Sequence, residues 1–119
     1  DGSNAAGSKI TGGLVTLTAT GAIGASGANN EIDTAAVSLD ESSTTAGDIF
    51  LGEANGVDLL DIDTANGSIT IVTGGATTAT AVDAGTTGSD VNITVSTGDI
   101  TVNHVSAASS TTGDDVTIA

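Results

Sequence analysis

The chain has 119 residues, 15 acids against a single lysine, a net charge of −14, one histidine, one phenylalanine and no cysteine. One basic residue cannot neutralise a run of phosphates, which argues against nucleic-acid binding and against attachment to anionic membrane surfaces. The lack of cysteine excludes disulfides and thiolate metal sites, and no apolar run is long enough to span a membrane.

Apolar residues recur at every second position in short segments along the whole chain. In chain order these segments are 13–19, 36–40, 47–52, 67–72, 89–96, 98–102 and 114–119. A period of two is strand spacing, and no segment shows the three-to-four-residue period of an amphipathic helix. The sequence therefore predicts an all-β protein with essentially no helix.

Five of these segments share a frame in which a small or acidic pair precedes two apolar residues separated by one position. The frames begin at Gly47, Gly67, Ser89, Gly98 and Asp114. Val15, Val37, Leu60 and Val82 are expected to be further strand positions between or before the frames. When these positions are included, most distances along the sequence between successive strands are roughly half the distance between the frames at Gly47 and Gly67. The repeat is therefore about 20 residues long, with about two strands in each unit.

A repeat of this length is typical of solenoids, whose units bury their apolar faces against one another. We predict a parallel β-helix of about six coils. Val, Ile, Leu, Ala and Thr would fill its narrow interior, while Gly and Asp would form the corners by positive φ and by local hydrogen bonds. Irregular steps predict bulged loops at 25–31, 75–88 and 107–113.

An antiparallel β-sandwich is the alternative fold, because it also contains about seven alternating strands. Asn55-Gly56 and Asn66-Gly67 are hairpin signals that favour it. The shortage of aromatic residues and the recurring frame favour the β-helix. Disorder is a third alternative, because Leu, Ile, Val and Phe make up 27 of the 119 residues, close to the roughly one-fifth typical of disordered chains.

The stretch "GGLVTLTATGAIGASG", with "AGDIFLGEANGVDLL" and "NGSITIVTGG" further on, resembles the repetitive region of filamentous-haemagglutinin-like bacterial exoproteins. The likeness covers about residues 12–119. It implies a right-handed parallel β-helix, export to the cell surface, and a role in adhesion, biofilm or extracellular fibres. The secretion domain of that family has no visible counterpart in this sequence.

Asp61 and Asp63 are the candidate metal ligands. Alternate residues of a strand share a face, so these two acids are expected to point outward around Ile62 and to join an acid of a neighbouring coil in holding calcium. The segment does not match an EF-hand loop, because Ala65, Asn66 and Val72 occupy the fifth, sixth and twelfth positions. A solvated acidic face is the alternative interpretation.

Enzymatic activity is not expected, and no catalytic residue or cofactor is predicted. His104 would be needed for any Ser-His-Asp site, but no G-x-S-x-G motif accompanies it, and an ordinary strand or turn residue is the simpler interpretation. Asn66 and Asn92 begin Asn-x-Ser/Thr motifs, which makes them weak N-glycosylation candidates.

The sequence thus predicts one solenoid segment over residues 1–119, either an excerpt of a longer repetitive chain or a stacking fibre subunit. Its expected role is a stiff acidic rod in a secreted adhesin or matrix fibre at the cell surface. Expected partners are further coils or copies of itself, with cell-surface or matrix polysaccharide as another partner. The alternative function is a β-sandwich module that binds carbohydrate or calcium.

Overall fold

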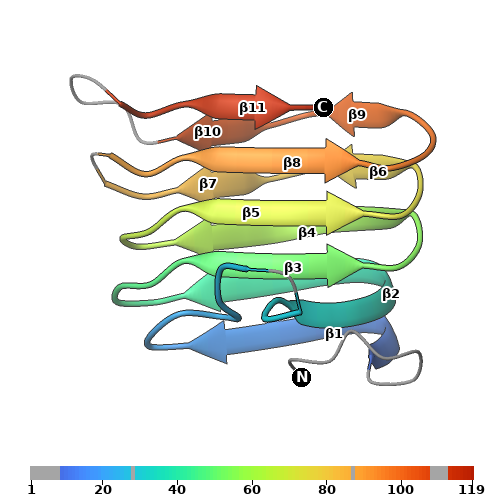
Figure 1. Cartoon of the computed structure of the whole chain (residues 1–119), viewed down its shortest axis with the longest axis horizontal. Coiled ribbons are helices and arrows are strands. Elements are labelled where there is room, and N and C mark those ends of the chain that lie inside the picture. Colours follow the sequence, from blue (N-terminus) through green and yellow to red (C-terminus); the bar gives the residue numbers. More distant parts are fainter. Residues whose placement is uncertain (1–8, 28, 87, 108–112) are drawn as a thin grey trace.

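The computed structural model describes residues 9–27, 29–86, 88–107 and 113–119, and over these residues the chain is a parallel β-solenoid (Figure 1). Its coils average about 22 residues, about five turns are stacked, and the described residues contain no helix. The predicted all-β parallel β-helix is therefore confirmed, although the expectation of six coils is about one too many.

Eleven strands build the solenoid over the described residues. They are β1 Ile10–Ala19, β2 Ile32–Ser43, β3 Ile49–Glu53, β4 Val57–Thr64, β5 Ile69–Thr73, β6 Thr77–Ala79, β7 Val82–Ala84, β8 Val91–Val95, β9 Ile100–Val102, β10 Val105–Ala107 and β11 Val116–Ile118.

The strands form two walls. The first wall stacks β3, β5, β8 and β11. The second wall stacks β1, β2 and β4, then β6 and β7, which follow each other along β4, and finally β9 on β6 and β10 on β7. Every pairing is parallel. The antiparallel sandwich is thus wrong, because Asn55-Gly56 and Asn66-Gly67 turn the chain from one wall to the other instead of closing hairpins.

The interior is a column of aliphatic side chains stacked row on row. In the first wall, Ile49, Ile69 and Val91 are register partners in three successive coils, and none of them is exposed. Each fully buried aliphatic side chain contributes about 2 kcal/mol of hydrophobic stabilisation. Because every coil is one strand thick, this stabilisation is shared between neighbouring coils, as the sequence repeat predicts.

The second residue of the frame links coils through its side chain. Asp48 Oδ1 accepts a hydrogen bond from the backbone N–H of Ser68 at 2.8 Å, and Ser68 Oγ accepts one from the N–H of Asp90 at 3.0 Å. Asp90 Oδ1 accepts the next from Asp115 at 3.0 Å. The acids and serine of the frame therefore bond the next coil, whereas the sequence predicted local bonds within the same corner.

Glycine is needed at the corners mainly because backbones of successive coils approach closely there. A Cβ on Gly67 would collide with the carbonyl of Gly47, and one on Gly74 would collide with the carbonyl of Ala54. Neither residue has positive φ, although Gly47 and Gly98 do. Positive φ explains only part of the glycine pattern.

Val37 and Leu60 lie in β2 and β4, as predicted, but their side chains are exposed, and the fully buried leucines of those strands are Leu39 and Leu59. The frame at Gly98 starts β9, which pairs with β6 on the second wall. This change of wall accounts for the short step between the frames at Ser89 and Gly98.

The loop predictions have three different outcomes. Residues 25–31 lie between strands β1 and β2, as expected. The segment 75–88 contains β6 and β7, so its assignment as a bulged loop is wrong; short β-branched runs were hidden there among small residues. Most of 107–113 lies outside the described residues.

The described part of the molecule measures 41 × 28 × 23 Å. The longest dimension runs along the strands, and the coils stack across it (Figure 1). These coils alone are therefore wider than their stack is tall, and an elongated rod requires more of them.

Candidate functional site

Four aspartates form an acidic face on the outside of the second wall. Asp40 is the register partner of Asp61, and Asp63 is the register partner of Asp83. Asp61 and Asp63 point outward on either side of Ile62, which is fully buried. The predicted geometry of alternating outward acids beside acids of neighbouring coils is therefore observed.

Like charges one strand spacing apart repel each other. The pKa of the Asp61 carboxyl lies above its ordinary value because of partial desolvation, followed by the negative charges of Asp63, Asp40 and Asp83. Asp63 is also occupied, because its Oδ2 accepts a hydrogen bond from Ser42 Oγ at 3.1 Å. The four aspartates thus raise the free energy of the folded state when they are all ionised.

No group of three or more Asp, Glu, His or Cys side chains in the described part of the chain has the geometry to hold a metal ion. Asp61 and Asp63 share a face with Asp40 and Asp83, and these four acids are not such a group. The calcium hypothesis for these residues therefore gains no support beyond the shared face.

His104 lies in the turn between β9 and β10, beside the acidic face. Its Nε2 is 2.8 Å from Asp83 Oδ1, and the two side chains are 57% and 42% exposed. A pair this exposed contributes little to stability. Among the described residues, Asp83 is the hydrogen-bond partner of the His104 ring.

The two glycosylation candidates occupy different settings. Asn66 is an exposed corner residue, and its Oδ1 accepts a hydrogen bond from Thr86 Oγ1 at 2.7 Å. Asn92 lies on the outer surface of β8 and is partly buried between the neighbouring strands. Asn66 is the more accessible of the two.

The interior contains two glutamates that the site prediction did not include. Glu41 lies on β2 between Leu17 and Ile62 in its row, is fully buried, and has no hydrogen-bond partner on either carboxyl oxygen. Desolvation, with a smaller effect of Asp40, raises the pKa of Glu41 from 4.5 to about 8. The side chain is therefore mostly protonated at neutral pH.

Glu53 is also buried, at the corner where β3 ends, but both of its carboxylate oxygens accept hydrogen bonds. Its Oε2 accepts from Thr34 Oγ1 at 2.7 Å and from the N–H of Ala36 at 3.0 Å. Its Oε1 accepts from the N–H of Asn55 at 2.9 Å. The carboxylate thus joins two coils at a corner where the strand ladder is interrupted.

The two-residue periodicity of the sequence indicates that both glutamates point inward. Glu41 follows Leu39, and Glu53 follows Ile49 and Leu51, at alternate positions, so a strict alternation places all of them inward. The charge of the side chain argued against an inward position, because glutamate is rarely fully buried.

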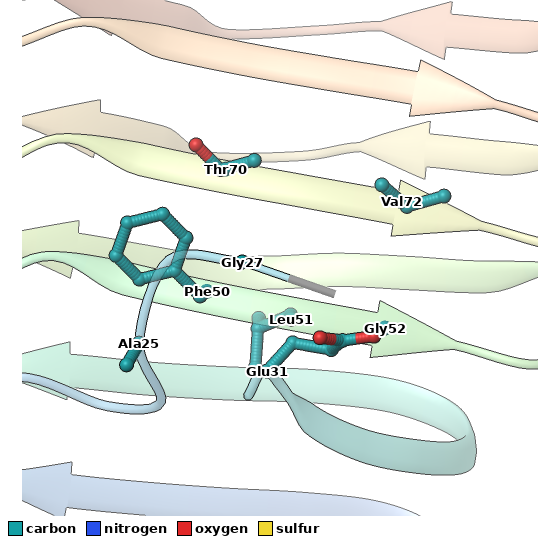
Figure 2. A pocket seen from close by; sticks show the side chains of 8 residues that line it. All are labelled: Ala25, Gly27, Glu31, Phe50, Leu51, Gly52, Thr70 and Val72. Atoms are coloured by element: carbon teal, nitrogen blue, oxygen red, sulfur yellow. The ribbon is translucent and has the colours of Figure 1, made fainter. Parts of the chain in front are cut away.

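Two adjoining cavities lie on the outer surface of the first wall, beside the segment that precedes β2, and Figure 2 shows the first of them. The first has a volume of about 310 Å³ and is bordered by Ala25, Phe50 and Val72. The second, of about 400 Å³, contains Lys9, Glu31, Asp33 and Glu53. Glu31, Gly52 and Val72 border both, so the cavities form one outer groove, apolar at one end and acidic at the other.

Comparison with known proteins identifies no relative, because no family model, no curated protein and no solved structure matches the chain. No helix among the described residues is long and apolar enough to cross a membrane. What is shown of this protein is therefore its β-solenoid architecture.

Proposed function

We infer that the chain is a structural segment of a secreted bacterial adhesin or extracellular fibre, in which its coils form part of a stiff acidic rod. The observation that carries this proposal is the open C-terminal end of the interior column. Val102, Val116 and Ile118 are 45%, 45% and 37% exposed, whereas Ile69 and Ile71, two coils below β11, are fully buried.

The open end also offers backbone groups for pairing. Among the described residues, β9, β10 and β11 each pair with a strand on one side only. Unpaired strand edges favour the addition of another strand, especially beside exposed apolar side chains. The occupant that fits both features is a further coil of the same kind, supplied by flanking chain or by a second copy.

The first coil matches this end row by row. Val15, Leu17 and Ala19 start three interior rows that end at Val102, Val105 and Ala107 in the last coil. A second copy placed with its β1 on β9 and β10 would continue each row with an aliphatic side chain of similar size.

The spacing of the two ends differs by one residue, because Val15 and Leu17 are two apart and Val102 and Val105 are three apart. The same difference occurs between β2 and β4, where the register shifts after Leu39. A bulge of the type already present in the fold would therefore accommodate the junction.

The surface chemistry is consistent with an extracellular rod. A net charge of −14 keeps rods apart laterally through repulsion, so that contacts are directed to the ends. The sequence resemblance to bacterial exoproteins supports secretion and the cell surface. No catalytic role is proposed, and binding of polysaccharide along the rod stays a prediction.

The proposal is tested by the assembly state of the purified chain. Sedimentation velocity and electron microscopy over a range of protein concentrations should show linear assemblies with the strand repeat of about 4.8 Å along their axis. Val116→Lys should keep the chain monomeric, because it places a charge on the open end of the column.

Val37→Lys is the matched control, because it makes the same substitution at an outward position that is 69% exposed and distant from the open end. This variant should assemble like the unmodified chain. A chain that stays monomeric at every concentration, or equal assembly by the two lysine variants, would contradict stacking at this end.

A further inference from the structure

The outer groove carries a feature that stacking does not use. Asp33 of β2 points outward, opposite Gly52 of β3, yet its side chain is almost entirely buried, with 5% of the residue exposed. Its Oδ2 has no hydrogen-bond partner among the described residues. A buried carboxylate oxygen without a donor costs free energy, so its presence at the acidic end of a cavity indicates a missing donor.

Gly52 lies directly against both acidic side chains. A Cβ at position 52 would lie 3.0 Å from Asp33 Oδ1 and 3.2 Å from Glu31 Cγ. Figure 2 shows the Glu31 carboxylate beside Gly52, at the boundary of the two cavities. Glycine therefore lets Asp33 and Glu31 lie this close to β3, and the site bordered by these three residues is called the notch.

The charges around this notch select a cation. Glu31, Asp33 and Glu53 contribute three negative charges against one positive charge on Lys9. Glu53 is already satisfied by three donors, which leaves Asp33 and Glu31 to bind a ligand. Within the described part of the chain, Lys9 forms no ion pair, and the acids there do not form a metal site.

The other end of the groove selects what the cation is attached to. Phe50, Val72 and Ala25 line the apolar part of the same groove (Figure 2). A bare metal ion would use none of this surface, whereas an aliphatic chain bearing a charged head would use both ends.

We propose that the outer groove is a binding site for an alkylammonium group, whose charged head donates to Asp33 and Glu31 while its aliphatic chain packs against Phe50 and Val72. An ammonium group carries three N–H donors, and Asp33 Oδ2 is the oxygen of the notch that lacks one. Lys9, on the same rim, opposes the ligand by its like charge. The site is independent of end-to-end stacking, because it lies on the outside of the first wall.

The test is an amide chemical-shift titration of the ¹⁵N-labelled chain with n-butylammonium chloride. The amides of Gly52, Thr73 and Gly74 should shift along a saturable curve with a dissociation constant on the order of 1 mM, as expected for one charged contact and a small apolar one. n-Butanol should give no saturation, because it lacks the charge.

Substitutions locate the binding. Asp33→Asn should weaken n-butylammonium binding by about tenfold or more, the loss expected for a charge-assisted hydrogen bond. Lys9→Gln should tighten it, and Asp83→Asn, an acid on the other wall, should leave it unchanged. If Asp33→Asn does not fold, Glu31→Gln and Gly52→Ala test the same notch, by removing a charge and by filling the space.

Other outcomes would overturn the proposal. Unchanged binding in the folded notch variants would place the ligand elsewhere, and saturation by n-butanol would reduce the groove to a nonspecific apolar surface. Saturation of the same amides by calcium chloride but not by n-butylammonium would make it a metal site. Nα-acetyl-lysine amide, titrated in parallel, distinguishes a protein lysine from a free amine as the source of the group.

Discussion

Glu41 and Glu53 are both buried within the same short solenoid, yet the hydrogen bonding of their carboxyl groups is opposite. Glu53 lies at a corner and receives three hydrogen bonds, two from backbone N–H groups. Glu41 lies within a wall, between Leu17 and Ile62, and receives none.

The difference follows from where a parallel β-helix has free backbone donors. In the middle of a wall every inward side chain is flanked by strands whose N–H groups already bond to the next coil. At a corner the ladder is interrupted, and N–H groups such as those of Ala36 and Asn55 need an acceptor. Acids are therefore stabilised at the corners of this fold and penalised in its walls.

The pH dependence of stability tests the Glu41 half of this comparison and has the largest expected effect. The pKa of Glu41 rises from 4.5 unfolded to about 8 folded, so between these pH values the folded state binds more protons. Its contribution is fully present below about pH 4.5 and is lost as pH rises to about 8, which amounts to about 5 kcal/mol. Urea unfolding of the chain and of Glu41→Gln across this range measures the difference, and parallel curves would contradict it.

Removal of the Glu53 carboxylate tests the other half. Glu53→Ala leaves three donors without an acceptor and should lower the free energy of unfolding by about 4 kcal/mol, a large part of a typical domain's stability. Glu31→Ala is the matched control, because Glu31 is only partly buried, and it should change stability by less than about 0.5 kcal/mol. Equal losses from both variants would show that the corner bonds are not what matters.

Replacement of Glu41 by an apolar residue should have the opposite sign. Glu41→Leu removes the need to protonate a carboxyl group on folding and should raise the free energy of unfolding by about 3 kcal/mol at pH 7. Most of this gain should disappear near pH 4.5, where the group is protonated readily in either state. A destabilised Glu41→Leu chain at pH 7 would refute the assignment of Glu41 as a penalised acid.

The smallest effect concerns a single bond to Glu53. Thr34→Val keeps the side-chain volume but removes the hydroxyl that donates to Glu53 Oε2, and it should cost about 1 kcal/mol. Thr70→Val, on the outer surface of β5, is the control and should be neutral. Thermal unfolding monitored by circular dichroism resolves the two, and a neutral Thr34→Val would show that the two backbone donors suffice for Glu53.

Much of the fold could be predicted because the repeat is visible in the sequence as the same residue types at recurring positions. The frames at Gly47, Gly67, Ser89 and Asp114 do stack, and their first apolar residues share one interior row. The frame at Gly98 has the same letters but starts a strand on the other wall. A local frame indicates that a strand begins, whereas the wall to which it belongs depends on how many residues each corner takes.

The candidate sites were less predictable for a related reason. The outward acids at Asp61 and Asp63 followed from alternation, but the acids of adjacent coils that accompany them are set by register. The Asp33 notch is even harder to predict from the sequence, because it depends on Gly52 lying opposite an acid of the preceding strand.

By itself the sequence determined that this chain is all β, repeats at the interval of one coil and fills its interior with small aliphatic side chains, because alternation acts between near neighbours and the frame recurs at a fixed interval. Only the tertiary structure decided which residues of successive coils are register partners. It therefore decided that the Glu53 carboxylate accepts hydrogen bonds, that Glu41 has no hydrogen-bond partner and that Asp33 is buried in the groove. Those outcomes depend on bulges and corner lengths, where a shift of one residue moves a side chain from the interior to the surface.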